Sequence, residues 1–276
     1  MKDFRDKVAA ITGAASGIGR SLSLELARRG AHLALSDVDE AGLAETELRA
    51  KRAGVEVTTA RVDVADRAAV ETWADRVVAD HGRVNLIANN AGVAVGATVE
   101  GTSYEDFEWL MGINFWGVVY GTKAFLPHLK AAGEGHVVNI SSIFGLMGIP
   151  SQSAYNSAKF AVRGFTEALR MELDIERGGV SATSIHPGGI KTNIARNARI
   201  GGGLDEIGQD PEAARRDFEK LFITSPDKAA RQIVRAVQLD KRRALVGPDA
   251  KVFDVLSKLP PGINQRLVAR GAGRGL

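Results

Sequence analysis

Residues 7–20 read KVAAITGAASGIGR, and this stretch decides the fold. Its first half is a short apolar run typical of a buried parallel strand, and glycines at positions 13, 17 and 19 follow directly. The residues after these glycines, IGRSLSLELARRG, have the period of an amphipathic helix. A strand, a glycine-rich turn and a helix in this order predict the start of a βαβ unit whose turn approaches a phosphate group.

The same alternation of apolar runs and amphipathic segments continues along the chain. Further buried strands are predicted at residues 31–36, 55–62, 84–89, 135–141, 180–187 and 243–247. Strands that alternate with helices imply right-handed crossovers and a parallel sheet covered on both faces. We therefore expect an α/β protein with a doubly wound, seven-stranded parallel sheet, the Rossmann fold.

Two regions depart from this rhythm. We expect a single Rossmann-type catalytic domain at residues 1–250, with an insertion at 193–225 that we interpret as a substrate lid, since GGG at 201–203 would serve as a hinge. Lys191 and Arg196 lie near the start of this insertion, and they are explained as well by solvated surface charges as by a role in the lid. Residues 251–276 form a C-terminal extension that covers a neighbour's active site, frays, or contacts an acidic partner or lipid; the sequence leaves these open.

Composition excludes several classes of function. Lysine and arginine number 36 against 33 acidic residues, and the last sixteen residues hold three arginines and no acid, so the rest of the chain is balanced and nucleic-acid binding is not expected. The chain has no cysteine, which excludes disulfides and thiolate chemistry and is compatible with the cytoplasmic location that we expect. No run approaches the roughly 18 apolar residues of a membrane span.

The glycine loop and an acid after the second strand predict the cofactor. Asp37 can accept hydrogen bonds from both hydroxyls of an adenosine ribose and would repel a 2′-phosphate. No lysine or arginine lies inside the loop before Gly19, and Arg20 already belongs to the first helix. NAD is therefore favoured over NADP. The alternatives are a tight turn without a ligand and, for Asp37, a loop acid or helix cap.

A second group of residues predicts the chemistry. Tyr155 and Lys159 are four residues apart in a helical segment, so they lie on one helix face, and the small side chains around them let cofactor and substrate approach. The ammonium group and an oxidised nicotinamide would both lower the pKa of the phenol from its usual value of about 10. Ser142, at the end of the fifth long strand, can donate a hydrogen bond to a substrate oxygen. A tyrosine–lysine pair at this spacing is most often structural. The upstream Ser142, the glycine loop and the predicted parallel sheet together favour a catalytic role for this pair.

In these motifs the chain resembles the short-chain dehydrogenase/reductase superfamily, from about residue 5 to residue 250. The resemblance implies that TGAASGIG (12–19) is the cofactor loop, that Asp63-Val64 contacts the adenine, and that NNAG (89–92) lies on the nicotinamide side. It also implies that HPGGIKT (186–192) is the segment that holds the nicotinamide carboxamide. It implies catalytic roles for Asn114, which would hold a water of the proton relay, and for Ser142, Tyr155 and Lys159. The cofactor-binding residues that it implies are Gly13, Ser16, Gly17, Ile18, Gly19, Asp37, Asp63, Val64, Asn90, Ala91, Gly92, Tyr155, Lys159, Pro187, Gly188, Ile190 and Thr192.

Structural roles remain open for some of these residues. Asn90 could be a buried turn residue without a cofactor contact, and Asn114 a satisfied helix-interior amide. His186, beside the predicted site, is better explained as a structural residue at a strand end. The other histidines are scattered, so no metal site is expected.

The substrate is predicted from the segment after Ser142. Phe144, Met147 and Ile149 are apolar, and no lysine or arginine lies among them to hold a carboxylate or phosphate. Together with Ser142 and Tyr155 they predict a hydrophobic secondary alcohol or ketone, such as a lipid, steroid, terpenoid or aromatic compound. The alternative is that this loop packs against the 193–225 insertion.

The resulting hypothesis is reversible hydride transfer by an alcohol dehydrogenase or ketoreductase, with Tyr155 as general acid/base. Enoyl reduction or epimerisation fits less well, because such enzymes of the superfamily usually have a wider tyrosine–lysine spacing or a different glycine spacing. A non-catalytic, dinucleotide-sensing protein on the same fold is the alternative outside enzymology. By analogy with the family, the helical segments at 102–132 and 151–178 are expected to pair in a homotetramer or homodimer.

Overall fold

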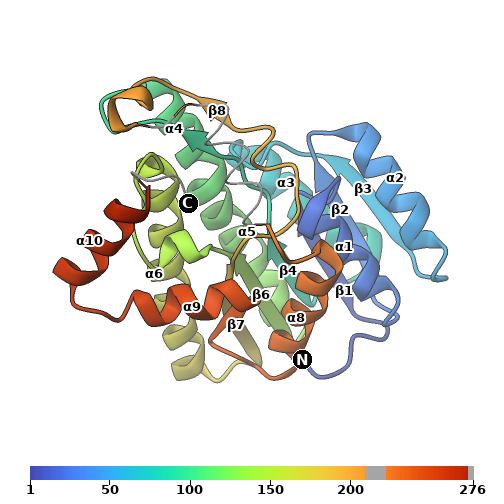
Figure 1. Cartoon of the computed structure of the whole chain (residues 1–276). Coiled ribbons are helices and arrows are strands. Elements are labelled where there is room, and N and C mark those ends of the chain that lie inside the picture. Colours follow the sequence, from blue (N-terminus) through green and yellow to red (C-terminus); the bar gives the residue numbers. More distant parts are fainter. Residues whose placement is uncertain (209, 211–221, 273–276) are drawn as a thin grey trace.

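A computed structural model of the chain describes residues 1–208, 210 and 222–272. Seven parallel strands form one sheet in the order β3-β2-β1-β4-β6-β7-β9, with helices on both faces (Figure 1). This confirms the predicted doubly wound sheet. The strands of the sheet are β1 (Val8–Thr12), β2 (His32–Asp37), β3 (Val57–Arg61), β4 (Leu86–Asn89), β6 (Gly135–Ile140), β7 (Val180–Pro187) and β9 (Arg243–Val246).

The helices connect these strands and extend beyond the last one. Those among the described residues are α1 (Gly17–Ala27), α2 (Glu40–Lys51), α3 (Arg67–His81), α4 (Tyr104–Met111), α5 (Gly117–Ala131), α6 (Ser153–Glu176), α8 (Pro226–Gln238), α9 (Pro248–Leu256) and α10 (Pro261–Ala272). Three short turns accompany them: the π-helical turn η1 (Gly112–Trp116) and the 3₁₀ turns η2 (Ile143–Gly145) and η3 (Asp205–Ile207).

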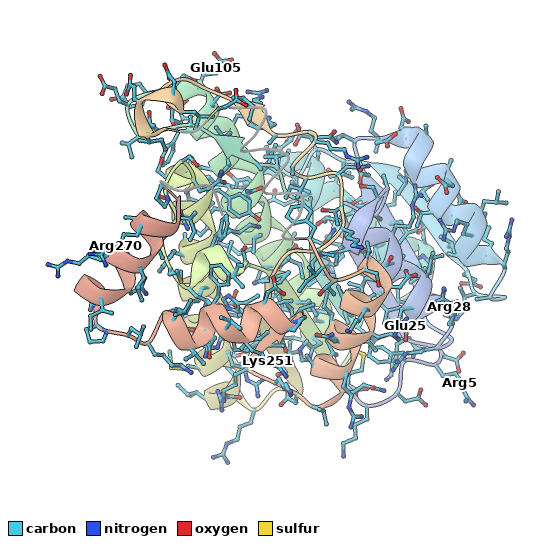
Figure 2. The ribbon with its side chains drawn as sticks, in the orientation of Figure 1. Arg5, Glu25, Arg28, Glu105, Lys251 and Arg270 are labelled. Atoms are coloured by element: carbon cyan, nitrogen blue, oxygen red, sulfur yellow. The ribbon has the colours of Figure 1, made fainter. Side chains whose placement is uncertain are left out.

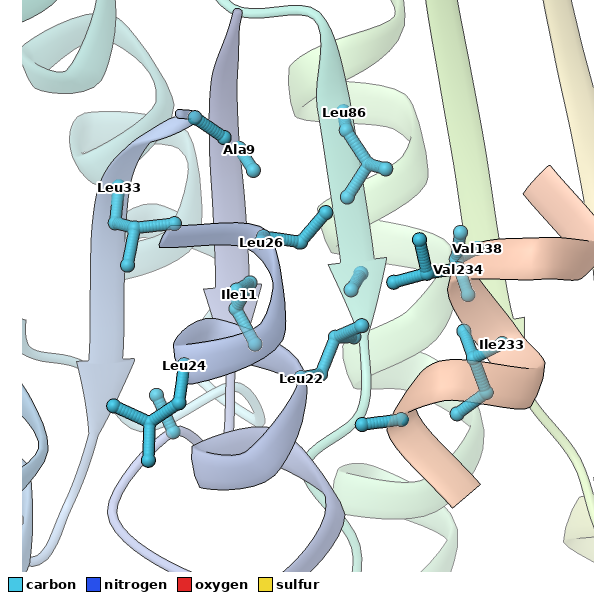
Figure 3. Close-up of a cluster of buried hydrophobic side chains, with 14 of the residues drawn as sticks. Ala9, Ile11, Leu22, Leu24, Leu26, Leu33, Leu86, Val138, Ile233 and Val234 are labelled. Carbon is cyan, nitrogen blue, oxygen red and sulfur yellow. The ribbon is translucent and has the colours of Figure 1, made fainter. Parts of the chain in front are cut away.

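Alternate residues of each strand face two separate hydrophobic cores. On one face, Ile11 of β1 and Leu33 of β2 pack with α1, α2 and α8, through side chains such as Leu26 and Ile233 (Figure 3). Each fully buried leucine or isoleucine contributes roughly 1.5–3 kcal/mol relative to an exposed one. A strand buried on both faces therefore reads as an unbroken apolar run, which is why the strands were predictable.

On the opposite face, α3, α5 and α6 cover the neighbouring strand residues. Ala10 of β1 and Val137 of β6 belong to this second cluster, together with Trp73 of α3 and Phe125 of α5. The rings of Trp73 and Phe125 meet edge to face with their centroids 5.0 Å apart. The two cores fix the sheet between the helix layers, so its carboxyl-terminal edge is a rigid platform for the loops that follow the strands.

The strand order reverses beside β1. Ile11 of β1 pairs with Leu35 of β2 on one side and with Ala88 of β4 on the other. In open α/β sheets, ligands bind at the carboxyl ends of strands where the order reverses. The glycine loop after β1 and the NNAG segment after β4 both begin at this point.

One pair of strands was not expected from the sequence. The two-residue strands β5 (Val95–Gly96) and β8 (Arg199–Ile200) form a separate parallel pair, which ties the start of the 193–225 segment to the loop after β4.

Two of the predicted boundaries stay untested. The charged run at 211–221, the centre of the predicted lid, lies outside the described residues. Helix α9 runs across residue 250, where the catalytic domain was expected to end, and the proposed domain division stays a prediction.

Charged side chains lie mainly at the periphery (Figure 2), and the exposed Arg28 there pairs with the largely buried Glu25 at 3.2 Å. In the part of the chain that the structure describes, no helix is long and apolar enough to cross a membrane. The same residues contain no group of three or more histidine or acidic side chains arranged to hold a metal ion.

Candidate active site

The backbone of the loop between β1 and α1 has a conformation that requires glycine at positions 13, 17 and 19. Gly13 and Gly17 have φ angles of +66° and +53°, in the left-handed region that strains other residues. A Cβ atom on Gly19 would overlap the carbonyl oxygen of Gly13. Ser16 is the exposed N-cap of α1, and the first turn of that helix, which includes Ile18, contains no acid. The helix N-terminus therefore presents backbone N–H groups and a positive dipole end, as a pyrophosphate site needs.

Asn90 attaches this loop to the end of β4. Its side-chain nitrogen donates to the carbonyl oxygens of Thr12 at 2.9 Å and of Gly13 at 3.1 Å. In return, the Thr12 hydroxyl accepts from the backbone N–H groups of Asn90 and Ala91, at 3.0 and 3.1 Å. Asn90 thus shapes the glycine loop through its amide nitrogen, and a direct cofactor contact by this residue stays a prediction.

Asp37 lies at the end of β2, beside the same loop. Its carboxylate accepts hydrogen bonds from the backbone N–H of Ala15 at 2.9 Å and of Asp39 at 3.1 Å. The nearby guanidinium of Arg20 is engaged inside the protein: it bonds to the carbonyl oxygen of Ala15, to Thr46 and to Glu45. The loop therefore presents an acid and not a cation toward the expected position of an adenosine ribose.

Asp63 and Val64 follow β3. Asp63 is exposed and its carboxylate accepts from the backbone N–H of Ala65 at 2.9 Å, which fixes the turn. Val64 is buried against the start of α5, where a Cβ on Gly117 would lie 2.8 Å from a Val64 methyl carbon. Both residues therefore lie in the loop after β3, where the Asp63 carboxylate bonds to its own turn. Their contact with an adenine stays a prediction.

Tyr155, Lys159 and Ser142 come together as the sequence predicts. Tyr155 and Lys159 lie one turn apart on α6, and the Lys159 ammonium is 5.5 Å from the centroid of the Tyr155 ring. The hydroxyl groups of Tyr155 and Ser142 are hydrogen-bonded to each other. Ser142 directly precedes η2, and its hydroxyl also accepts from the Phe144 N–H at 3.1 Å. One phenol, one hydroxyl and one ammonium are thus assembled at the carboxyl edge of the sheet.

The pKa of Tyr155 differs from the sequence-based expectation. Burial raises it to about 12, while the hydrogen bond from Ser142 acts in the opposite direction. Burial also lowers the pKa of Lys159 to about 8, and its ammonium donates to the Ile140 carbonyl at 3.0 Å. In the protein alone, loss of hydration therefore dominates the pKa of the phenol. The lowering that we expect from the Lys159 ammonium together with an oxidised nicotinamide stays a prediction for the cofactor complex.

Asn114 lies in the π-helical turn η1, a rare distortion that often marks functional sites. Its fully buried amide makes two 2.8 Å hydrogen bonds with Val93, one to the backbone N–H and one to the carbonyl. A Cβ on Gly92 would lie 3.2 Å from the Asn114 side-chain oxygen and 3.7 Å from the Lys159 nitrogen. Asn114 therefore fixes the NNAG segment next to Lys159, and its role in a water relay stays a prediction.

The segment after β7 closes the other side of the site. Gly188 donates to the Val246 carbonyl at 2.9 Å, which continues the pairing of Pro187 with Val246. Ile190 is buried, and Thr192 approaches the glycine loop so closely that a Cβ on Gly17 would lie 3.0 Å from the Thr192 methyl carbon. The predicted nicotinamide segment and the predicted pyrophosphate loop are therefore neighbours.

The predicted substrate wall is apolar, and sequence reasoning missed the residue that shapes it. The rings of Phe144 and Tyr155 meet edge to face at 5.9 Å, and Ile149 packs in the same cluster, while Met147 is buried. The buried amide of Asn156, next to Tyr155, donates to the carbonyls of Phe144 at 2.7 Å and Met147 at 3.0 Å and accepts from the Ile149 N–H at 3.0 Å. The wall is thus built onto the helix that carries Tyr155.

His186 is buried beside Ser142, as a structural residue would be. Its Nδ1 atom is 2.8 Å from the Ser142 carbonyl oxygen, and its Nε2 atom is 2.9 Å from the Ser184 hydroxyl. Burial lowers the pKa of His186 to about 4, so the ring is neutral near pH 7 and can donate from Nδ1 and accept at Nε2. This neutral ring holds the backbone of Ser142.

The described start of the insertion is docked onto the body. The Arg199 guanidinium stacks 3.6 Å from the centroid of the Trp109 ring and bonds to Asp106 at 2.8 Å, both on α4. A Cβ on Gly201 would lie 2.8 Å from the Ala97 methyl carbon. The sequence up to β8 is therefore tied to the loop after β4, and closure of a lid stays a prediction.

Comparison with known proteins matches this architecture. The family model described as short chain dehydrogenase matches residues 7–201. SadH of Mycobacterium tuberculosis, which has a provisional oxidoreductase name, is 50% identical over 99% of this chain and 98% of its own. A short-chain dehydrogenase/reductase from Burkholderia phymatum, solved in complex with NAD, is 31% identical with a TM-score of 0.84, covering 93% of this chain and 94% of that one. Levodione reductase is 29% identical with a TM-score of 0.78, covering 91% and 98%.

Proposed function

The chain belongs to the short-chain dehydrogenase family, and we propose that it is an NAD-dependent oxidoreductase that interconverts an apolar secondary alcohol and its ketone. The observation that carries this proposal is the hydrogen-bonded pair of Tyr155 and Ser142 with the Lys159 ammonium near the phenol ring. This set lies at the carboxyl edge of the sheet, where the glycine loop also begins. The non-catalytic alternative does not require such a proton-transfer group beside a dinucleotide loop.

The residues around the glycine loop fit a dinucleotide. The positive φ angles of Gly13 and Gly17 and the acid-free start of α1 suit a pyrophosphate. Asp37 would accept the ribose hydroxyls. NAD is preferred in this proposal because the Asp37 carboxylate would repel a 2′-phosphate, and because Arg20 already bonds to Thr46 and Glu45. The NAD complex of the Burkholderia relative supports the same choice.

The side chains divide the chemistry among them. The bound nicotinamide would supply hydride transfer to or from the carbon that bears the oxygen. Tyr155 exchanges a proton with the substrate oxygen, and Ser142 orients that oxygen by hydrogen bonding. Lys159 binds ribose hydroxyls of the cofactor and stabilises the phenolate, and Asn114 holds the Gly92 and Val93 backbone against Lys159. The rigid cores beneath these groups keep them oriented for the reaction.

The pKa values show what each direction of the reaction requires of Tyr155. With its pKa raised to about 12, Tyr155 is protonated near neutral pH and is ready to donate a proton during ketone reduction. Alcohol oxidation needs the phenolate, so it depends on positive charge close to the ring. Lys159 has a pKa lowered to about 8 and is charged below that pH. NAD preference makes oxidation the physiological direction in this proposal.

An apolar substrate is proposed from the composition of the wall. Phe144, Met147 and Ile149 carry no charge, and Phe144 contacts the ring of Tyr155 directly. A cyclic or aromatic ketone would bury apolar surface here while its oxygen reaches Ser142 and Tyr155. The name of one structural relative, levodione reductase, refers to the reduction of an oxo compound and is consistent with this class.

A substrate screen tests the proposal. The purified chain is mixed with NADH and ketones of graded polarity, or with NAD and the matching alcohols, and the NADH absorbance is followed. We expect turnover that increases with the apolar surface of the substrate and is faster with NAD than with NADP. A preference for sugars or polyols would refute the apolar site. NADH binding without turnover of any ketone, alcohol, enone or sugar in the panel would favour the sensing protein.

Three further assignments belong to this proposal. Phe160, Met171 and Ile175 expose 41%, 58% and 80% of their surface on α6, which supports pairing of this helix in a homotetramer or homodimer. We propose a cytoplasmic location, with which a cysteine-free chain is compatible. We also retain residues 1–250 as the catalytic domain and 251–276 as an extension. Sedimentation of the purified chain as a monomer would refute the oligomer.

A further inference from the structure

Helix α9 begins beside the predicted nicotinamide segment. Strands β7 and β9 are neighbours, and Pro187 at the end of β7 pairs with Val246 at the end of β9. The chain after Val246 turns at Gly247, with φ of +103°, and enters α9. The first turn of α9 therefore lies against the loop that follows Pro187.

Asp249 in this first turn fills a slot between two glycines. Its Oδ2 atom accepts a hydrogen bond from the Gly189 N–H at 2.6 Å. A Cβ on Gly188 would overlap the Asp249 carboxylate, and one on Gly247 would lie 2.6 Å from the Asp249 Oδ1 atom. Oδ1 is buried and finds no hydrogen-bond partner among the described residues. The carboxylate is thus enclosed and is directed at the backbone of the loop.

The Gly189 peptide is held from its other side by Thr224. The Thr224 N–H donates to the Gly189 carbonyl at 3.1 Å, and the Thr224 carbonyl accepts from the Lys191 N–H at 2.9 Å. Gly189 consequently has both of its backbone groups bonded, its carbonyl to Thr224 near the end of the 193–225 insertion and its N–H to Asp249 beyond it. Of these two attachments, only the one from Asp249 uses a side chain, so only that one can be removed by substitution.

The position of this loop matters to the cofactor site because the loop contacts the glycine loop. A Cβ on Gly17 would lie 3.0 Å from the Thr192 methyl carbon, which leaves little room for movement. On its other side, α9 buries Ala250 in one cluster with Ile143 and with Phe144 of the substrate wall. One short helix therefore contacts both the nicotinamide segment and the wall.

We propose that Asp249 is a positioning residue that holds residues 188–192 in the form that binds the cofactor, which makes helix α9 part of the cofactor site. This inference rests on the proposed function. An acid in the first turn of a helix also stabilises that helix through its dipole. The experiment must therefore separate stability of α9 from the bond to Gly189.

Three variants make that separation. Asp249→Ala removes the acceptor, and Asp249→Asn keeps an oxygen that can accept from Gly189. Asp254→Ala is the matched control, since Asp254 is a buried acid of the same helix that pairs with Arg243 at 3.0 Å and Lys258 at 2.8 Å. The measurements are the Kd for NADH by fluorescence titration, hydrogen exchange of peptides covering 188–192 without cofactor, and thermal stability.

We expect Asp249→Ala to weaken NADH binding about tenfold, as loss of a charge-assisted hydrogen bond would, and to speed exchange at 188–192. Asp249→Asn should restore both to near the wild-type values. Asp254→Ala should lower thermal stability while leaving the Kd and the exchange of this segment unchanged. If Asp249→Ala binds NADH like the wild type, or if Asp254→Ala weakens binding equally, the positioning role is refuted. Failure of the wild-type chain to bind NADH would instead refute the proposed function and, with it, this inference.

Discussion

The ammonium nitrogen of Lys159 lies 5.5 Å from the centre of the Tyr155 ring, one helical turn away on α6. This spacing places a positive charge where it stabilises a phenolate, in surroundings that otherwise disfavour that phenolate. The opposing effects of burial and charge make Tyr155 a group whose protonation depends on what else is bound beside it. The predictions below follow from this arrangement and from the loops around it.

Replacing Lys159 by methionine should change the pH dependence of alcohol oxidation. Oxidation needs deprotonated Tyr155, so its rate should rise with pH. The oxidised nicotinamide should lower the phenol pKa into the range in which Lys159 is still charged. Loss of the ammonium should then raise the phenol pKa and shift the rising limb to higher pH by one unit or more, about 1.4 kcal/mol of lost stabilisation. The pH profiles of kcat/KM for alcohol oxidation by the wild type and by Lys159→Met measure the shift. An unchanged limb in Lys159→Met would show that the lysine charge does not control Tyr155.

Asp37 should control the choice between NAD and NADP. Asp37→Ala removes both the acceptor for the ribose hydroxyls and the charge that repels a 2′-phosphate, so the ratio of kcat/KM for NAD over NADP should fall at least about tenfold. Asp39→Ala is the control, because Asp39 is a nearby acid that caps α2 by accepting from Gly42. Equal ratios in wild type and Asp37→Ala would contradict this role.

Asn156 should determine the shape of the substrate wall. Asn156→Ala leaves the carbonyls of Phe144 and Met147 and the N–H of Ile149 without their partner. We expect a loss of about 3 kcal/mol or more in unfolding free energy and a larger rise in KM for bulky than for small ketones. Ser157→Ala, an exposed neighbour on α6, should change neither. A uniform fall in kcat without a change in size selectivity would argue against a role in the wall.

The sequence predicted those parts of the molecule that local patterns encode. The inner strands of the sheet, such as β1 and β4, are short apolar runs because both of their faces are buried, whereas the edge strands β3 and β9 are only partly buried. The four-residue spacing of Tyr155 and Lys159 places them on one helix face without knowledge of the fold. The three glycines of the loop could be recognised because two of them need positive φ angles and the third leaves no room for a side chain.

What the sequence could not predict depends on tertiary contacts. Asn156 and Asp249 bond to backbone groups that lie 7 to 60 residues away, and any residue can supply those groups, so side-chain type gives no signal. The β5–β8 pair is only two residues long in each strand, too short for a detectable period. The raised pKa of Tyr155 follows from burial, which becomes visible only when the surrounding loops are in place.

Acid should destabilise the protein through two buried histidines. Burial lowers the pKa of His136 to about 3 and that of His186 to about 4. Both rings stay neutral in the folded state while the unfolded chain takes up protons below about pH 6.5, so stability is full above that value and is lost as the pH falls. At about pH 5 each histidine should cost about 2 kcal/mol of unfolding free energy.

Urea unfolding near neutral pH and at about pH 5 measures this loss. His136→Gln, which cannot titrate, should remove about 2 kcal/mol of the loss at about pH 5. His128→Gln, on the outer side of α5, should retain it. The same acid dependence in His136→Gln as in wild type would show that other groups cause the loss.

The central claim is that Tyr155 transfers the proton, and Tyr155→Phe tests it most directly. The phenyl ring preserves packing against Phe144 while the hydroxyl bonded to Ser142 is lost. Two quantities are measured for the wild type and for Tyr155→Phe: the Kd for NADH and the turnover number with one ketone substrate. We predict an unchanged Kd for NADH with turnover reduced at least about a hundredfold, as expected for loss of a general acid/base. Turnover at the wild-type rate with intact NADH binding would contradict the account.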